Sequence, residues 1–208
     1  MDLNTRYDIE TYIECVNSYF VTNVATEHSY REPLQHLLKQ ILNRGVKKDQ
    51  DKVIVINEAT RKDYGAPDFE FRKNNVAISF METKKIGDSD LLGENDKQHK
   101  EQFDRYKNAV NMIAFTDYLS FYLYENGQRT ISATIAKIEQ GQIVLNENEQ
   151  QLSEFLKIIC ALGGAEPQPI RSAKLLAETM AAKAKIIADV LEKAMKKNDT
   201  NEDHDLPA

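Results

Sequence analysis

The sequence predicts a mixed α/β fold in which helices flank one central sheet and a helical extension follows at the C-terminal end. Three observations indicate this class. Apolar residues recur with helical spacing at both ends of the chain, and short apolar runs typical of strands lie in its middle. One segment with helical spacing lies between these strands. The 208 residues, 41% hydrophobic and 29% charged, are enough for one packed core.

Two amphipathic helices are expected before the first strand. Residues 5–24 place apolar side chains three and four positions apart, which is the spacing of one helix face. Residues 29–43 repeat this spacing, with Pro33 in the first turn and Gly45 just beyond the end. The first 43 residues therefore predict a helical layer.

After the second helix, the spacing of apolar residues changes to that of β-strands. Residues 53–56 form a β-branched run, which is typical of a strand buried on both faces. Phe69 and Phe71 alternate with polar residues in a second strand, and residues 76–83 form a third. Further strands are expected at residues 112–116, 120–124, 130–136 and 142–145.

Two more helices complete the predicted domain. Residues 96–109 cross over between two strands, and residues 147–162 form a helix that Gly163 and Gly164 end. The domain is thus expected to span residues 1–164. A linker and helical spacer follow at 165–197, where residues 172–196 carry an apolar stripe, and a disordered tail is expected at 198–208.

Composition restricts the possible environments and partners. No apolar run is long enough to span a bilayer, so no membrane partner is expected. Cys15 and Cys160 each lie within an apolar helical pattern, which predicts two buried free thiols in a reducing cytoplasm. The net charge of −6 argues against strong binding of DNA phosphates by this chain alone.

The residues with the clearest chemistry lie between Pro67 and Lys84. Strand side chains alternate, so Glu82 and Lys84 point to the same side at the end of the third strand. A hairpin between the second and third strands would bring Asp68 beside Glu82. Two neighbouring carboxylates repel each other unless a cation lies between them, and Mg²⁺ prefers oxygen ligands and also binds phosphate.

This arrangement predicts a hydrolytic site for a phosphodiester. A lysine beside the metal ion can orient or help to deprotonate water and can offset charge in the transition state. The spacing alone leaves open a solvated hairpin with surface ion pairs. The apolar run before Glu82 favours the functional interpretation, because charged residues that end a buried strand are often functional.

A second polar pair lies in the expected helix at 96–109. Gln102 and Tyr106 are four residues apart and therefore share one helix face. They could contact a phosphate or support Lys84, although an ordinary helix surface would show the same pair.

Six short motifs in this order resemble the N-terminal PD-(D/E)xK nuclease domain of type IIG and type ISP-like restriction–modification enzymes. The resemblance covers roughly residues 26–124, and its Gln-x-x-x-Tyr element is similar to the RecB-like branch of these nucleases. The motifs are Glu27–Leu34, Asn57-Glu58, Gly65–Phe69, Glu82–Gly87, Gln102–Tyr106 and Phe115–Tyr118.

The resemblance implies a restriction-endonuclease-like fold and a Mg²⁺-dependent deoxyribonuclease, with Mn²⁺ as a substitute, that acts on double-stranded DNA. It implies that Asp68 and Glu82 are metal ligands, joined by the Thr83 carbonyl, and that Lys84 is the catalytic lysine. In the same way, it implies that Glu27 lies near the metal and that Gln102 and Tyr106 support the site.

The chain departs from the family in two respects. Glu32 occupies a position where the family often has a small or apolar residue, and no methyltransferase motif is present. A methyltransferase and target-recognition region is therefore expected in the same or a companion chain. Two alternatives remain open: a non-catalytic module of the same fold coupled to a methyltransferase or helicase, and a module that processes DNA ends.

Overall fold

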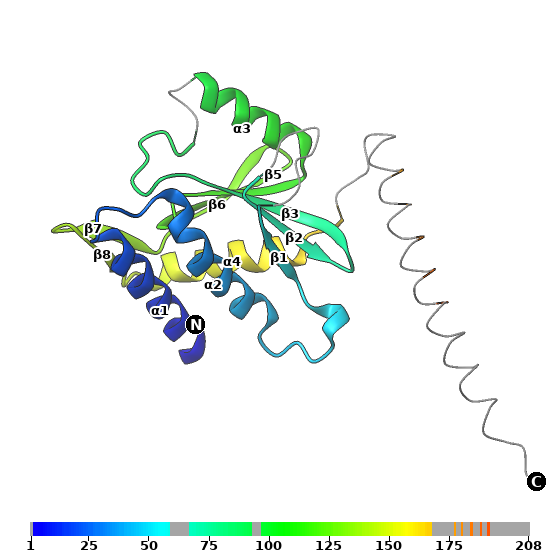
Figure 1. The fold of residues 1–208 in the computed structure, drawn as a ribbon, viewed down its shortest axis with the longest axis horizontal. Helices are drawn as coiled ribbons and strands as arrows, with labels where there is room; N and C mark the ends of the chain where they lie inside the picture. The colour runs from blue at the N-terminus through cyan, green and yellow to red at the C-terminus, as the bar shows by residue number, and fades with distance from the viewer. Residues whose placement is uncertain are drawn as a thin grey trace, which may run out of the picture. The chain divides into compact units, whose positions relative to one another are not determined.

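A mixed β-sheet forms the centre of the structure, which is a computed structural model (Figure 1). Residues 2–58, 67–92 and 97–167 are described, together with five single helical positions beyond them. The five positions are Ala177, Met180, Ala184, Ala188 and Leu191. The chain divides into two compact units, Met1–Gln168 and Pro169–Ala208.

Within the described residues, six strands form this sheet in the order β1-β2-β3-β4-β5-β6. Neighbours are antiparallel except β3 and β4, which are parallel. The strands are β1 (Ile54–Asn57), β2 (Phe69–Lys73), β3 (Val76–Thr83), β4 (Met112–Thr116), β5 (Ser120–Glu125) and β6 (Gln128–Thr134). A separate hairpin is formed by β7 (Ala136–Glu139) and β8 (Gln142–Leu145).

The helices occupy the positions that the periodicity predicts. They are α1 (Leu3–Phe20), α2 (Arg31–Asn43), α3 (Lys97–Ala109) and α4 (Glu149–Gly164), with short 3-10 helices η1 (Glu27–Tyr30) and η2 (Asp49–Asp51). Side chains cap two of the N-termini: Asp2 accepts from the Thr5 amide, and Asn148 accepts from the amides that begin α4. The restriction-endonuclease-like fold class predicted above is confirmed.

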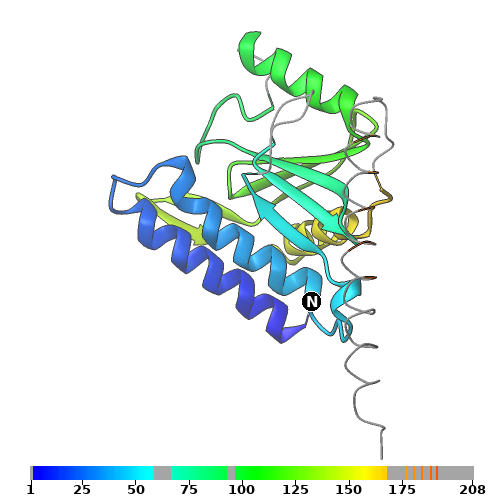
Figure 2. The same cartoon turned by 45° about the vertical axis from the view of Figure 1, so that its right-hand side comes forward.

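The two faces of the sheet are covered by different helices. α3 lies on one face, while α1, α2 and α4 lie on the other (Figure 1; Figure 2). Alternation along β3 shows how this is specified. Phe80 belongs to the apolar cluster formed with Phe103 and Tyr106 of α3, whereas Ser79 points to α4. The helix α3 is also the crossover that makes β3 and β4 parallel.

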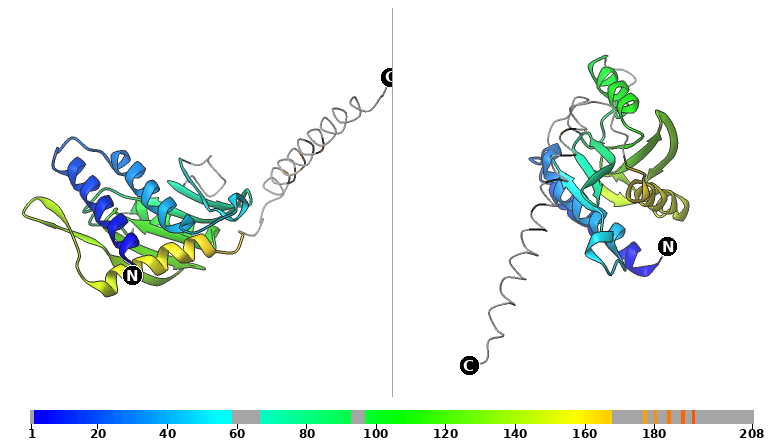
Figure 3. Two further views of the ribbon diagram at one scale, coloured as in Figure 1. Left: turned by 90° about the horizontal axis from the view of Figure 1, so that it is seen from below. Right: turned by 90° about the vertical axis from the view of Figure 1, so that its right-hand side faces the viewer.

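The β7–β8 hairpin packs beside α1 (Figure 3). Asn17 Oδ1 of α1 accepts a 2.8 Å hydrogen bond from the Ile143 amide of β8. This contact satisfies a backbone donor of a hairpin that lies outside the main sheet.

Three expectations from the sequence were wrong in detail. The single strand expected at residues 130–136 is instead the end of β6 and the start of β7, which are separated at Ile135. The β1 strand is not buried on both faces: it is at the edge of the sheet and Ile54 is 48% exposed. The two cysteines are free, but Cys15 is only partly buried and Cys160 is exposed. Apolar periodicity indicates an element but not its place in a sheet, and only sheet order decides whether a second face is covered.

The helical spacer predicted at 172–196 falls almost entirely outside the described residues, as does the tail at 198–208. The five described positions between 177 and 191 are helical, and Met180 and Leu191 are exposed. The predicted boundaries near residues 164 and 197 stay predictions. Among the described residues, no helix is long and apolar enough to cross a membrane.

One buried hydrogen bond connects β3 to the end of α4. Ser79 Oγ donates to the Leu162 carbonyl at 2.7 Å, and both residues are fully buried. This carbonyl is among the last four of the helix, which lack partners within the helix. Replacing Ser79 by alanine would therefore leave a buried acceptor unpaired.

We expect Ser79→Ala to lower the free energy of unfolding by about 1–3 kcal/mol, measured by urea denaturation. The matched control is Ser120→Ala, because its hydroxyl contact with Thr134 is only partly buried. This control is expected to change stability by less than about 0.5 kcal/mol. Equal stabilities of the two variants would contradict the role given to the Ser79 hydrogen bond.

Candidate active site

The β2–β3 hairpin brings the predicted acidic residues to the same end of the sheet. Its turn residues Asn74 and Asn75 have φ values of 51° and 61°, the left-handed conformation that a tight hairpin needs. The register pairs Phe69 with Met81, despite an irregularity further along β2. Asp68 Oδ2 consequently accepts a 2.8 Å hydrogen bond from the Thr83 amide.

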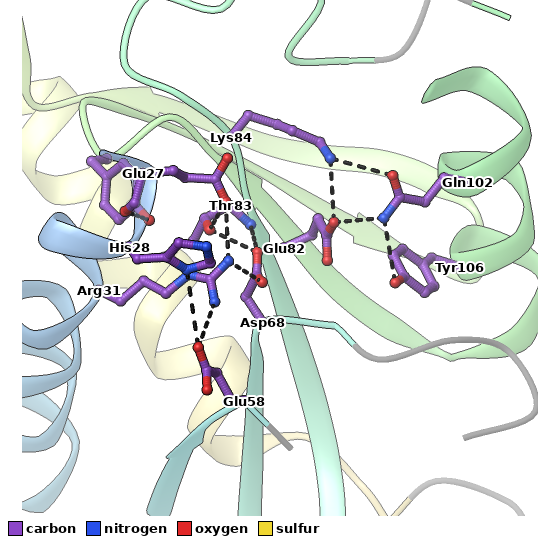
Figure 4. Close-up of polar contacts among 11 residues, drawn as sticks. Glu27, His28, Arg31, Glu58, Asp68, Glu82, Thr83, Lys84, Gln102 and Tyr106 are labelled. Atoms are coloured by element: carbon purple, nitrogen blue, oxygen red, sulfur yellow. Dashed lines mark hydrogen bonds and ion pairs between the residues drawn. The ribbon is translucent and has the colours of Figure 1, made fainter. Parts of the chain in front are cut away.

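Glu82, near the end of β3, and Lys84, directly after it, point to the same side, as alternation predicts, and both meet helix α3 (Figure 4). Lys84 Nζ lies 3.3 Å from Glu82 Oε1 and 3.3 Å from Gln102 Oε1. Gln102 Nε2 in turn donates to Glu82 Oε1 at 2.7 Å. The three side chains form a closed polar network in which Gln102 fixes both the carboxylate and the ammonium group.

Glu82 is held in a strongly desolvated position. It is only 4% exposed, and its Oε2 atom is buried with no hydrogen-bond partner among the described residues. Burial, and then the nearby Asp68 charge, together raise the pKa of Glu82 from 4.5 to about 8, even though Lys84 acts in the opposite direction. With this pKa, Glu82 is mostly protonated at neutral pH despite the nearby Lys84, unless a metal cation binds to it.

Asp68 is the centre of a second network, on the side of η1 and α2. Its Oδ1 atom forms an ion pair with Arg31 Nη2 at 2.5 Å, while Oδ2 accepts from the Thr83 amide and hydroxyl. Arg31 Nη2 also donates to Glu27 Oε1 at 3.0 Å. Thr83 Oγ1 lies 3.3 Å from the same Glu27 oxygen. Glu27, at the start of η1, is thereby brought to the site.

Tyr106 contributes mainly through packing. Its ring is buried in the apolar cluster beneath α3, and its hydroxyl lies 3.5 Å from Gln102 Nε2. The Lys84 ammonium group is 5.5 Å from the centre of the Phe103 ring in the same cluster. Gln102 and Tyr106 thus share one face of α3, where Gln102 contacts Lys84 and Tyr106 packs in the apolar cluster beside it.

The sequence interpretation did not single out two residues that the structure places at this site. Arg31 is one turn after Glu27, and this i, i+4 pair of opposite charge was visible in the sequence. Tyr118 lies between β4 and β5 with φ at 73°, and its hydroxyl donates to the Glu27 carbonyl at 2.8 Å. No local signal in the sequence indicates that contact, because the two residues are far apart in the chain.

The donor set fits a hard divalent cation. Among the described residues, no group of three or more His, Cys, Asp or Glu side chains is arranged to hold a metal ion. Mg²⁺ needs fewer protein ligands, because it commonly binds one or two carboxylates and completes its octahedron with water and phosphate oxygens. Asp68 and Glu82 supply this number, and the unpartnered Glu82 Oε2 is an available ligand atom.

Comparisons with known proteins agree with the fold. No protein-family model and no curated protein matches the chain. A solved structure, the cryo-EM structure of a DrdV–DNA complex, is similar with a TM-score of 0.51 and 17% sequence identity. The similarity covers 77% of this chain but only 14% of that one. This chain therefore has the fold of one segment of a much longer protein that was solved together with DNA.

Proposed function

We propose that this chain is a metal-dependent DNA endonuclease domain of the PD-(D/E)xK type and the cleavage module of a restriction–modification system. The observation that carries the proposal is the convergence of Asp68, Glu82 and Lys84 at the end of the β2–β3 hairpin. The fold likeness to a protein solved on DNA supports the choice of substrate. A companion methyltransferase and target-recognition region belongs to the same proposal.

Asp68 and Glu82 are the proposed ligands of Mg²⁺, together with the Thr83 carbonyl, and Mn²⁺ is the proposed substitute. When bound, the ion would supply Lewis acidity toward a phosphate oxygen and lower the pKa of a coordinated water. Glu82 must lose its proton to serve as a ligand, because metal binding requires the ionised carboxylate. The buried position of Glu82 then favours a bound cation over an unpaired charge.

Lys84 is the proposed catalytic lysine. Gln102 holds its ammonium group beside Glu82, so the lysine does not need to be ordered when DNA arrives. An ammonium group in this partly desolvated place can orient the attacking water and can offset the negative charge that develops on the phosphate. Glu27 and Tyr106 act one step further away, through Thr83 and Gln102 respectively.

A non-catalytic module of the same fold is the second candidate. In this structure the Arg31 guanidinium already balances the charge of Asp68. An arginine that replaces the metal ion in this way is what a site that no longer binds metal would show. A module that processes DNA ends would share the site and would differ in the substrate that it accepts.

The test is incubation of the full chain with supercoiled plasmid, which has no ends. We expect nicked or linear product with Mg²⁺ or Mn²⁺, and none with Ca²⁺ or with EDTA, because Ca²⁺ tolerates looser coordination and activates water poorly. Product from linear DNA alone would favour end processing. A chain that binds metal and DNA but cuts neither substrate would favour the non-catalytic module.

A further inference from the structure

We propose that Arg31 is a built-in competitor of the metal ion: its guanidinium holds Asp68 in the metal-free chain and must release it when the metal binds. The proposal rests on the proposed function, since it concerns the affinity of that same site. Its starting point is that both oxygens of Asp68 already have partners, Arg31 on Oδ1 and Thr83 on Oδ2.

Arg31 is held too deeply for its contact with Asp68 to be an ordinary surface ion pair. The residue is 5% exposed, and the ion pair of 2.5 Å joins it to an aspartate side chain that is only 14% exposed. In such surroundings a charge interaction is weakly screened, so a guanidinium at Oδ1 directly opposes a divalent cation at the same carboxylate. A guanidinium and a divalent cation on the same carboxylate repel each other, so each weakens the binding of the other.

The exchange is feasible because Arg31 has other acidic partners. Its Nη2 atom also donates to Glu27 at 3.0 Å, and its Nη1 atom lies 3.4 Å from Glu58 (Figure 4). A guanidinium displaced from Asp68 would therefore keep a carboxylate on each of its terminal nitrogens. No buried cation is left unpaired by metal entry, which removes the main cost of breaking a buried ion pair.

The present position of Arg31 also leaves one donor unused. Its Nε atom is buried with no hydrogen-bond partner among the described residues. Buried guanidinium donors are normally satisfied, so this position does not use the full bonding capacity of the side chain. The contact with Asp68 therefore holds Arg31 with one donor unsatisfied, which lowers the cost of leaving that position.

The test is calorimetric titration of Mn²⁺ into the full chain without DNA, at one fixed pH. Arg31→Met removes the charge but keeps an unbranched side chain, and we expect it to bind Mn²⁺ about tenfold more tightly than wild type, a typical size for coupling between sites. Arg31→Lys, which keeps a cation, is expected to stay within about threefold of wild type. Tighter binding by Arg31→Met alone is the result that supports the competitor role.

Two controls separate this inference from the proposed function. Arg44→Met removes an arginine that pairs with Asp2 and Asp8, roughly 20 Å further along α2, and is expected to leave affinity unchanged. Asp68→Asn is expected to abolish the binding heat. If Asp68→Asn bound Mn²⁺ as wild type does, the proposed metal site and this inference would both fail. If Asp68→Asn abolished binding but Arg31→Met bound Mn²⁺ no more tightly than wild type, this inference would fail and the proposed metal site would stand.

A measurement on the wild-type chain avoids dependence on a variant that folds poorly. The guanidinium N–H resonances of Arg31 can be followed by NMR during a Mg²⁺ titration. We expect them to shift, with the midpoint that a parallel calorimetric titration of Mg²⁺ gives, because the guanidinium loses its Asp68 partner. Unchanged resonances at saturating Mg²⁺ would show that Arg31 stays on Asp68, and the competitor role would be wrong.

Discussion

Replacing Lys84 by alanine is expected to reduce the rate of DNA cleavage by roughly 10²–10⁴-fold, the usual contribution of a positioned group that handles a proton or developing charge. Lys84 is the cation that Gln102 holds at Glu82, and the described part of the structure shows no other lysine in that network. Asp68→Ala and Glu82→Ala are expected to be nearly inactive for a different reason, since each removes a proposed metal ligand.

The neighbouring residue offers a matched control. Lys85 follows directly in the sequence and is exposed, so Lys85→Ala removes the same charge from the same segment without touching the network. Cleavage of supercoiled plasmid at saturating Mg²⁺ is the measurement, and circular dichroism checks that each variant is folded. A Lys84→Ala chain that cut DNA as fast as Lys85→Ala would show that Lys84 is not the catalytic lysine.

The second large effect is a loss of stability in the metal-free chain as pH rises from about 4.5 to about 8. Burial, and then the Asp68 charge, raise the pKa of Glu82 from 4.5 to about 8. The folded chain therefore keeps this proton at a pH where the unfolded chain has already lost it, and stability falls across that interval. The fall from Glu82 is expected to be roughly 3–5 kcal/mol.

Urea denaturation in EDTA between pH 5 and pH 8.5 measures this effect. Burial also raises the pKa of Asp117, so the wild-type curve contains a second contribution of the same sign. The comparison with Glu82→Gln isolates Glu82, because the amide does not titrate and Asp117 is unchanged. We expect the variant to become the more stable of the two near pH 8. Parallel curves for the two chains would mean that Glu82 titrates normally.

The affinity for the metal should change with pH in the opposite direction to the stability of the metal-free chain. Since the metal requires the ionised Glu82 carboxylate, Mn²⁺ affinity is expected to increase up to about pH 8.

The sequence by itself determined the order and type of most elements and the three residues at the end of the hairpin. The spacing of apolar residues, about 3.6 in a helix and 2 in a strand, is a local property of the chain. Side-chain alternation along β3 and the residue after it likewise requires Glu82 and Lys84 to point to the same side. The hairpin between β2 and β3 is also local, so the approach of Asp68 to this edge could be predicted from a short turn.

Only the tertiary structure decided what surrounds those residues. The Arg31 contact with Asp68, the Tyr118 contact with Glu27 and the position of Gln102 between Lys84 and Glu82 join segments of different elements. The burial that raises the pKa of Glu82 also depends on the packing of α3 against the sheet. Such contacts depend on how the layers pack, and a pattern in one segment carries no information on which side chain another segment will place against it.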